Sequence, residues 1–273
     1  MSQVLVTGGT GTLGRAVVAR LLARHHGVRL LSHRASAAVP SGVEVCSGDL
    51  AEGTGLDEAV AGMDAIIHCA SNSREDRHQT DIDGTRTLVQ AASAHGRPHL
   101  VYISIVGIDR STYAYYQAKY QAEQLIEQGP LPWTILRTTQ FHALVLRLLQ
   151  SCGIDTRAEV SVPAGMRFQS IDHREVADRL VQLVEQEPSG LAPEMGGPQV
   201  LTIEEMAATY LRLQGRKATV RPEPMTGALF DVFRSGINLI PTHAEGTITW
   251  EAFVAQGVGP TKQPGVDERD RKE

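Results

Sequence analysis

The sequence predicts an α/β protein built around a doubly wound parallel sheet. Short apolar runs that lack polar alternation recur along the chain, beginning with Val4–Val6, and such runs are typical of strands buried on both faces. Amphipathic helical stretches separate these runs. The first run passes through a glycine-rich turn directly into a helix. Together these features indicate alternating strands and helices, with helices on both faces of the sheet.

Length and composition are those of an ordinary globular protein. The 273 residues are 42% hydrophobic, which suits one large or two modest domains. A net charge of −5 and the lack of a Lys/Arg run argue against a nucleic-acid partner. Cys46, Cys69 and Cys152 are isolated, as expected for reduced thiols in the cytoplasm. No spacing of ligands predicts a metal site.

From the sequence we also expect no membrane-spanning segment and no signal peptide. No apolar stretch approaches about 18 residues, so we expect no membrane partner. A strand at residue 3 leaves no room for a signal peptide. We therefore expect a cytoplasmic protein with a small-molecule substrate, and the sequence is compatible with a homo-oligomer.

The glycine turn predicts a dinucleotide site. A strand that turns at once into a helix points free N–H groups and a positive dipole end at whatever lies in the turn. Gly8 allows the tight turn, Gly11 allows close approach of a pyrophosphate, and Gly14 allows close packing of the helix. A tight turn that binds nothing is the alternative. The predicted binding residues here are Thr7, Gly8, Gly11, Thr12, Leu13 and Gly14.

The string TGGTGTLG at residues 7–14 resembles the start of the extended and atypical short-chain dehydrogenases/reductases, including the NmrA-like group. The resemblance implies a Rossmann-type fold with a smaller C-terminal substrate-binding region. We expect an NAD(P)-binding domain over residues 1–150 and a capping region over 151–258 that partly folds back on it. The tail, 259–273, lacks large apolar residues and is predicted to be disordered.

The end of the second strand, 28–32, bears on the choice of cofactor. About 20 residues past the glycine turn, an acidic residue would bind the ribose hydroxyls of NAD. The chain has Ser32, His33 and Arg34 instead. A guanidinium can grip a phosphate with two hydrogen bonds, so Arg34 favours NADP(H) over NAD(H), with Arg15 as an assistant. The alternative is that Arg34 is a solvated loop residue.

The third and fourth strands, 43–46 and 64–70, flank a short helix over 56–61. The resemblance places Asp49, followed by Leu50, against the adenine amino group, although Asp49 alone reads as a turn residue. Ala70 and Ser71 follow the fourth strand, at the edge where open sheets bind ligands. His68 is predicted to be a buried, hydrogen-bonded core residue.

A polar segment, 72–79, is predicted to form part of the cofactor rim. After it, residues 81–92 resemble the N-V-x-G-T-x-x-L-x-x-A-A helix of extended short-chain dehydrogenases, with Asp81 replacing the asparagine. Because such a helix packs on the sheet, we expect an architectural role for it.

The fifth strand, 99–104, ends in Ser104, and a helix is predicted over 112–128. Within it Tyr115 and Lys119 are four residues apart and share one face. Ser104 followed by Y-x-x-x-K resembles the active site of the short-chain dehydrogenases. The resemblance implies that Tyr115 donates a proton, that Lys119 lowers the pKa of Tyr115 and holds the nicotinamide ribose, and that Ser104 bonds the substrate oxygen. Packing of a tyrosine-rich helix is the alternative, and Tyr116 is a second candidate donor.

The sixth strand, 133–138, leads to Gln140, Phe141 and His142. In relatives the matching stretch forms a wall of the substrate pocket, which makes these three residues candidate substrate contacts. Alternatively, Phe141 is a core residue and His142 begins a helix that runs to Gln150. His142 is also a substitute proton donor.

Past residue 150 the alternation of strands and helices loosens. Residues 164–169 are predicted to be a loop. Capping boxes are expected at Asp172–Glu175 and Thr202–Glu205, opening helices that end near Val184 and Leu213. Further helices are expected over 225–240 and 250–254.

These patterns favour an NADPH-dependent oxidoreductase that reduces a carbonyl or quinone-like small molecule. Two alternatives stay open. One is an NmrA-like sensor that binds the dinucleotide without chemistry, since fold alone does not decide function. The other is an epimerase or dehydratase that retains its cofactor.

Overall fold

The chain forms a Rossmann-type α/β fold. The computed structural model describes residues 1–33, 39–71 and 78–257. Within them, seven parallel strands form one sheet in the order β3-β2-β1-β4-β5-β6-β9. Their bounds are β1 Gln3–Thr7, β2 Gly27–Ser32, β3 Val43–Ser47, β4 Ala65–His68, β5 His99–Ile105, β6 Trp133–Thr138 and β9 Gly190–Leu191. The predicted doubly wound sheet is confirmed, and β9 is an addition that the sequence did not predict.

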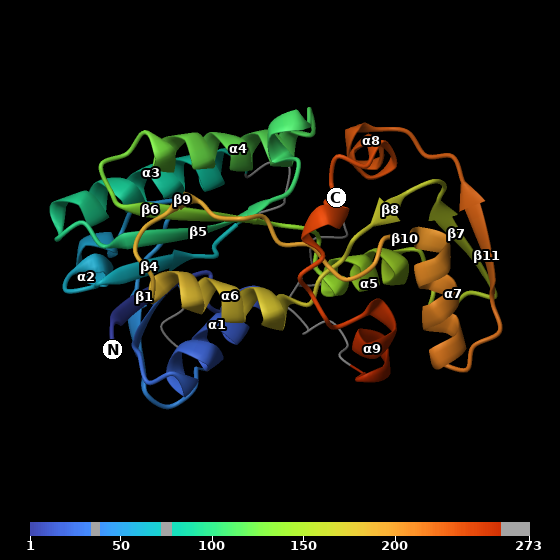
Figure 1. Ribbon diagram of the computed structural model, residues 1–273, viewed down its shortest axis with the longest axis horizontal. Helices are drawn as coiled ribbons and strands as arrows, with labels where there is room; N and C mark the ends of the chain where they lie inside the picture. The colour runs from blue at the N-terminus through green and yellow to red at the C-terminus, as the bar shows by residue number, and fades with distance from the viewer. Residues whose placement is uncertain (34–38, 72–77, 258–273) are drawn as a thin grey trace, which may run out of the picture.

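Helices cover both faces of this sheet (Figure 1). On one face lie α1 (Thr12–Ala23) and α6 (His173–Val184). On the other lie α2 (Leu56–Val60), α3 (His78–Ala94) and α4 (Ala114–Glu127). The prediction of helices on both faces is therefore correct.

The two faces of each central strand enter different hydrophobic cores. In β1, Val4 and Val6 join the core beneath α1 and α6, whereas Leu5 joins the core beneath α2, α3 and α4. All three are fully buried. Side chains alternate along a strand, so burial on both faces demands an unbroken apolar run, which is the pattern that the sequence shows.

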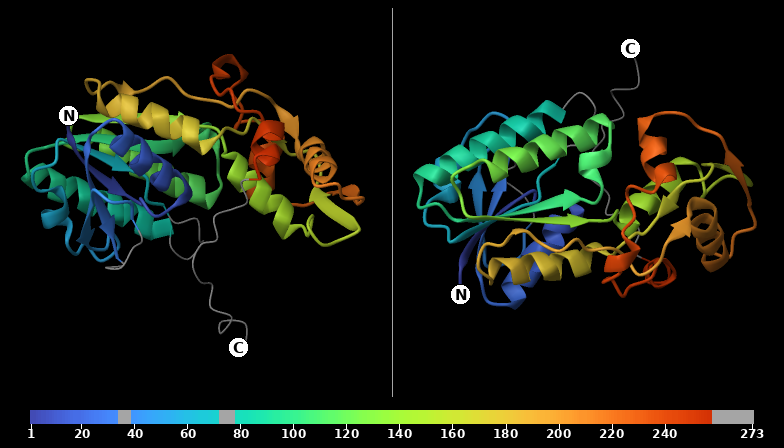
Figure 2. Two further views of the ribbon diagram at one scale, coloured as in Figure 1. Left: turned by 90° about the horizontal axis from the view of Figure 1, so that it is seen from below. Right: turned by 45° about the horizontal axis from the view of Figure 1, so that its top comes forward.

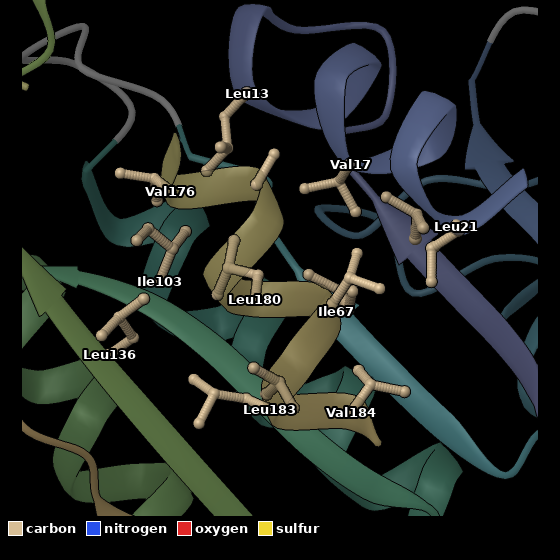
Figure 3. Packing of buried hydrophobic residues seen from close by; sticks show 14 of the residues in the cluster. Leu13, Val17, Leu21, Ile67, Ile103, Leu136, Val176, Leu180, Leu183 and Val184 are labelled. Carbon is tan, nitrogen blue, oxygen red and sulfur yellow. The ribbon is translucent and has the colours of Figure 1, made fainter. Parts of the chain in front are cut away.

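Helix α6 packs beside α1 against the sheet, although 150 residues separate them in the chain (Figure 3). Leu13, Val17 and Leu21 of α1 lie close to Leu180 and Val184 of α6 (Figure 3). Full burial of a side chain of this size contributes roughly 1.5–3 kcal/mol. The chain after residue 150 thus supplies part of the core of the central sheet.

The remaining C-terminal elements form a second group beside the carboxyl end of β6 (Figure 2). They share a separate core with Tyr116 and Ile108. The elements are α5 His142–Ser151, β7 Glu159–Pro163, β8 Arg167–Phe168, β10 Leu201–Thr202, α7 Ile203–Leu213, β11 Thr219–Glu223, α8 Ala228–Ser235 and α9 Trp250–Ala255. Strand β7 pairs with β11 in parallel, and β8 pairs with β10 in antiparallel orientation.

Several C-terminal predictions need correction. The expected loop 164–169 contains β8. The expected helix 225–240 is only α8, because Gly227 and Gly236 adopt positive φ angles of 132° and 79° at its two ends. A capping box does open α7 at Thr202 and Glu205. At α6 only half of the expected box forms, since Asp172 caps the Arg174 amide but Glu175 accepts hydrogen bonds from Thr247.

Three expectations fall outside the described residues: Arg34, most of the polar segment 72–79, and the tail 259–273. Among the helices in the described ranges, none has the length and apolar character needed to cross a bilayer.

Candidate dinucleotide-binding and active site

A cavity of about 400 Å³ opens at the carboxyl ends of the central strands. After β1 the chain goes first to β2 and β3 on one side, and later returns to β4 on the other. Such a switch point leaves a crevice in which open α/β sheets bind ligands. The lining residues are Gly8, Thr10, Gly11, Leu31, Ser32, His33, Gly48, Asp49, Leu50, Ala51, His68, Cys69, Ala70, Ser71, Asp81, Gly84 and Thr85.

The turn after β1 is closely packed at Gly8. Its φ of +68° is a conformation that side chains disfavour, and a Cβ there would lie 2.6 Å from the backbone nitrogen of Ala70. At Gly14 a Cβ would overlap the carbonyl oxygen of Gly8. The predicted roles of Gly8 and Gly14 in turning and packing therefore correspond to real steric limits.

The N-terminus of α1 borders this cavity, and its own first turn offers no acidic side chain to offset the positive dipole end. Gly11 is the N-cap, makes no side-chain capping bond, and the first turn of α1 contains no acidic residue. Free N–H groups and the positive dipole end suit an anion. The residues present fit the diphosphate of a dinucleotide. Arg15 donates from Nε to the Thr10 carbonyl oxygen over 2.8 Å, which places its guanidinium beside the turn.

A hydrogen-bonded chain fixes the floor of the cavity. The Ala70 amide donates to Thr7 Oγ1 over 3.3 Å, and Thr7 Oγ1 lies 2.6 Å from His68 Nδ1. His68 Nε2 lies 3.1 Å from Thr85 Oγ1, which in turn donates to the Asp81 carbonyl oxygen. The only consistent set of protons gives His68 a hydrogen on Nε2. Burial lowers the pKa of His68 to about 3, with a further contribution from the charge of Lys119, so it is neutral.

His68 is thus the buried, hydrogen-bonded core residue that the sequence predicts. Thr7, by contrast, is predicted to bind the dinucleotide, but its side chain is fully buried and directed at His68. Thr7 therefore positions the Ala70 loop and does not line the cavity.

At the other end of the cavity lie the residues that follow β2 and β3. Ser32 and His33 line it, and Asp49 and Leu50 face them. Asp49 Oδ1 accepts a hydrogen bond of 2.8 Å from the Ala51 amide, so the carboxylate is held by its own turn while it borders the cavity. Both interpretations of Asp49, turn residue and cavity residue, are compatible with this geometry.

Helix α3 contributes more to the cavity than its predicted architectural role. Asp81, Gly84 and Thr85 all line it. A Cβ at Gly84 would lie 3.1 Å from Leu50 Cβ, so the glycine allows α3 to approach the loop after β3 closely. The spacing of these residues, at i, i+3 and i+4, is the signal that could have identified a functional face.

Tyr115 lies at the edge of this cavity. Its hydroxyl is 2.9 Å from Ser71 Oγ, and Ser71 Oγ donates to Asp81 Oδ2 over 3.0 Å. Ser71 and Asp81 both line the cavity. Burial raises the pKa of Tyr115 to about 12, and the negative charge of Asp81 acts in the same direction.

Lys119 lies one helical turn further along α4. It is buried, and its Nζ is 4.3 Å from the centroid of the Tyr102 ring. Burial lowers the pKa of Lys119 to about 8. Its charge favours a lower pKa at both His68 and Cys69, which line the cavity, although burial raises the pKa of the Cys69 thiol overall to about 12. The pKa of Tyr115 is raised overall because burial of the phenol is the largest effect on it, and the expected lowering by Lys119 stays a prediction.

Ser104, at the end of β5, is only 2% exposed. Its hydroxyl has no hydrogen-bond partner within the described ranges of the chain. A buried hydroxyl without a partner costs roughly 1–3 kcal/mol, so it is a group that a bound ligand could satisfy. Tyr116, the second candidate donor, instead accepts a hydrogen bond from Gln140 Nε2 over 3.0 Å inside the C-terminal core.

The predicted substrate contacts after β6 are each engaged by other groups of the protein. His142 is 1% exposed, and its ring nitrogens lie 2.8 Å from Ser170 Oγ and 2.9 Å from the Ile248 carbonyl oxygen. To exchange a proton with a substrate, the His142 ring would have to break one of these two hydrogen bonds. His142 is therefore poorly placed to replace Tyr115 as the proton donor. Gln140 is buried between Tyr116 and Asn238, and Phe141 packs against the core of α1 and α6.

The structure therefore divides the predicted binding residues into two groups. Those that line the cavity are Gly8, Gly11, Asp49, Leu50, Ala70 and Ser71. Those that do not line it are Thr7, Thr12, Leu13, Gly14, Ser104, Tyr115 and Lys119. Cys69, Asp81 and Gly84 line the cavity and were not predicted as site residues. Their contribution depends on how β4 and α3 meet, which local sequence does not reveal.

Known proteins of similar sequence include reductases. The chain is 30% identical over 222 residues to the (4-alkanoyl-5-oxo-2,5-dihydrofuran-3-yl)methyl phosphate reductase of Streptomyces griseus, covering 78% of this chain and 74% of that protein. It is 27% identical to the 4-hydroxy-2-methyl-3-oxo-4-farnesyl-3,4-dihydroquinoline-1-oxide ketoreductase of Stigmatella aurantiaca, covering 97% and 85% of the two chains.

Among solved structures, the NADPH-dependent quinone oxidoreductase QOR2 of Escherichia coli, complexed with NADPH, superposes with a TM-score of 0.78. The match covers 93% of this chain and 99% of that one at 17% identity, which establishes the shared fold.

The family model described as NAD(P)H-binding matches residues 8–187, the stretch that carries the glycine turn, the cavity and α6. This chain belongs to the NAD(P)H-binding family.

Proposed function

We propose that the protein is an NADPH-dependent oxidoreductase of the atypical short-chain dehydrogenase type that reduces a carbonyl or quinone-like small molecule. Two relatives are named reductase and ketoreductase, and the second aligns over nearly the whole chain. The observation that carries the proposal is the position of Tyr115, whose hydroxyl reaches Ser71 at the wall of the dinucleotide cavity.

The choice of NADPH over NADH rests on the residues after β2. Ser32 and His33, which line the cavity, present no carboxylate to repel a phosphate, and Arg34 follows them in the sequence. A guanidinium at this position would grip the 2′-phosphate. The diphosphate would lie against Gly8 and Gly11 at the start of α1, with the adenosine near Asp49 and Leu50.

When bound, the reduced dinucleotide supplies a hydride to the substrate carbon. Tyr115 would give a proton to the oxygen that becomes negative, and the Ser104 hydroxyl would donate a hydrogen bond to that oxygen. Lys119 would hold the nicotinamide ribose and add positive charge beneath the cavity. Its pKa of about 8 still leaves it mostly charged at neutral pH.

The test is NADPH oxidation by the purified protein over a panel of ketones, aldehydes and quinones. Tyr115→Phe should lower kcat by about 10²- to 10⁴-fold on a substrate that the wild type reduces, the usual contribution of a general acid. Lys119→Ala should lower kcat and weaken dinucleotide binding. Tyr120→Phe, on the same helix and without a role here, is the matched control and should keep wild-type activity.

Wild-type activity in Tyr115→Phe would remove Tyr115 from the chemistry. Tyr116→Phe decides between the neighbouring phenols, and we expect it to keep most of the activity. Binding of NADPH without its consumption on any substrate would instead favour the sensor.

A further inference from the structure

The hydrogen bonds around Ser71 form a directed chain. Ser71 Oγ carries one hydrogen and donates it to the Asp81 carboxylate over 3.0 Å. The contact of 2.9 Å between Ser71 Oγ and the Tyr115 hydroxyl must then be donated by Tyr115. The phenolic hydrogen therefore points toward the carboxylate, through one intermediate hydroxyl.

This chain of hydrogen bonds joins three elements, and its Ser71 end is exposed to solvent. Tyr115 is on α4, Ser71 follows β4, and Asp81 is on α3. Ser71 is exposed and Asp81 is half-buried, while Tyr115 is embedded among tyrosine rings. Within the described parts of the protein, the titratable groups that act on this chain of hydrogen bonds include the ammonium of Lys119 from α4, the carboxylate of Asp81, and the phenols of Tyr113 and of Tyr102 from β5. The exposed end is thus the end at which protons can exchange with water.

We propose that Ser71 and Asp81 form a proton relay that links Tyr115 to solvent during the reduction. The proposal deepens the proposed function and rests on it. Asp81 stands where the related helix pattern has an asparagine, which can bond a serine but cannot carry a proton at this point.

The proton balance is simple. The hydride forms a C–H bond, and the electron pair of the C=O π bond moves to oxygen. Tyr115 gives its proton to that oxygen, and Ser71 Oγ gives one to the phenolate. The Asp81 carboxylate takes up a proton from solvent and passes it to Ser71, so that Asp81 ends as the carboxylate from which it started. The substrate gains one hydride and one proton, and the three side chains return to their starting state.

The arrangement makes the protonation of Asp81 part of turnover. When Asp81 is ionised, the relay can take up a proton from an alcohol substrate, as the oxidation reaction requires. With Asp81 protonated, the relay delivers a proton, which is the direction of reduction.

The first test compares Asp81→Asn with wild type on a substrate that the panel identifies. Asparagine keeps an acceptor for Ser71 and cannot relay. We expect kcat for reduction to fall about 10- to 100-fold, with KM for the carbonyl substrate within about twofold. Asp83→Asn removes the same charge two residues away, where Asp83 pairs with Arg86, and should leave kcat unchanged. An unchanged kcat in Asp81→Asn would overturn the relay.

The second test does not need a substrate, so it separates the relay from the proposed function. The titration of Tyr115 is followed by NMR of ¹³Cζ-labelled tyrosine in the NADPH complex, with Tyr115→Phe assigning the signal. Asp81→Asn removes a negative charge and should lower the pKa of Tyr115, whereas Ser71→Ala removes a stabilising hydrogen bond and should raise it. If neither variant shifts the titration, the relay is wrong even if the protein proves to be a reductase.

Discussion

Gly8 lies where the turn after β1 touches the loop after β4, and both loops line the cavity. Its positive φ alone would make a side chain costly, and its contact with Ala70 adds a steric limit. Gly62 has nearly the same φ, +72°, but a Cβ there would meet nothing within 4 Å. Comparing a substitution at Gly62 with one at Gly8 therefore separates the free-energy cost of the left-handed backbone from that of steric crowding.

We predict that Gly62→Ala lowers the free energy of unfolding by about 1–2 kcal/mol, the cost of the left-handed conformation, and leaves dinucleotide affinity unchanged. Gly8→Ala should cost roughly a further 1–3 kcal/mol through crowding, and should weaken dinucleotide binding. Urea unfolding and calorimetric titration measure the two effects. Equal losses of stability and equal affinities in the two variants would show that the close approach to Ala70 is unimportant.

His68 couples the floor of the cavity to pH. The folded pKa, about 3, lies well below the ordinary value near 6.5, so the unfolded chain binds a proton that the folded chain refuses. The stability that this neutral histidine contributes is present above pH 6.5 and is lost as the pH falls toward 3.

We predict that the stability of the wild type falls by up to about 1.4 kcal/mol for each pH unit below 6.5 on account of His68. In His68→Gln this contribution disappears, so the advantage of the wild type at pH 7 should shrink by pH 4.5 in urea unfolding. A difference between the two proteins that stays constant with pH would contradict a neutral His68.

At the level of single residues, the sequence predicted the pair Tyr115 and Lys119 because four-residue spacing on a helix is a local property. It could not predict that Lys119 would lie over Tyr102, or that burial would raise the pKa of Tyr115. It also left His142 among the site residues, since its partners Ser170 and Ile248 lie 28 and 106 residues away.

Among the elements, α7 shows how far local signals determine helix boundaries. Thr202 accepts from the Glu205 amide, and Glu205 Oε2 accepts from the Thr202 amide. Both bonds lie within four residues, so the sequence predicts them. The matching signal at α6 failed because a distant segment, Thr247 and Ile248, takes up the carboxylate of Glu175.

For α7 we predict that Thr202→Ala lowers the free energy of unfolding by about 1 kcal/mol. Because Thr202 and Glu205 bond each other's backbone, the double variant Thr202→Ala with Glu205→Ala should lose less than the sum of the two single losses. Thermal or urea unfolding of the four proteins measures the coupling. Strict additivity would show that the two halves of the box act independently.

Apart from β9, the strands of the central sheet were predictable, whereas those of the C-terminal group were not. A strand buried on both faces must be apolar at each position, as Val4, Leu5 and Val6 are. Strand β11 is largely exposed and lies at an edge, so its sequence, TVRPE, carries no such pattern. Its pairing with β7 depends on contacts between segments about 60 residues apart.

Across the whole molecule, the chain after residue 150 serves two purposes. Helix α6 completes the core beneath the nucleotide-binding sheet, and the remaining elements build a separate core beside it. Tyr116 of α4 belongs to that second core, while Tyr115, the next residue, reaches the cavity. A change of packing in the C-terminal group can therefore reach the proposed proton donor through one helix.

The account depends most directly on the binding of a pyridine dinucleotide by the cavity at the start of α1. Calorimetric titration of the purified protein with NADPH and with NADH tests this without knowledge of the substrate. We predict binding of one NADPH per chain, tighter than that of NADH and weakened by Gly8→Ala but not by Gly62→Ala. Absence of measurable affinity for either dinucleotide would contradict the account.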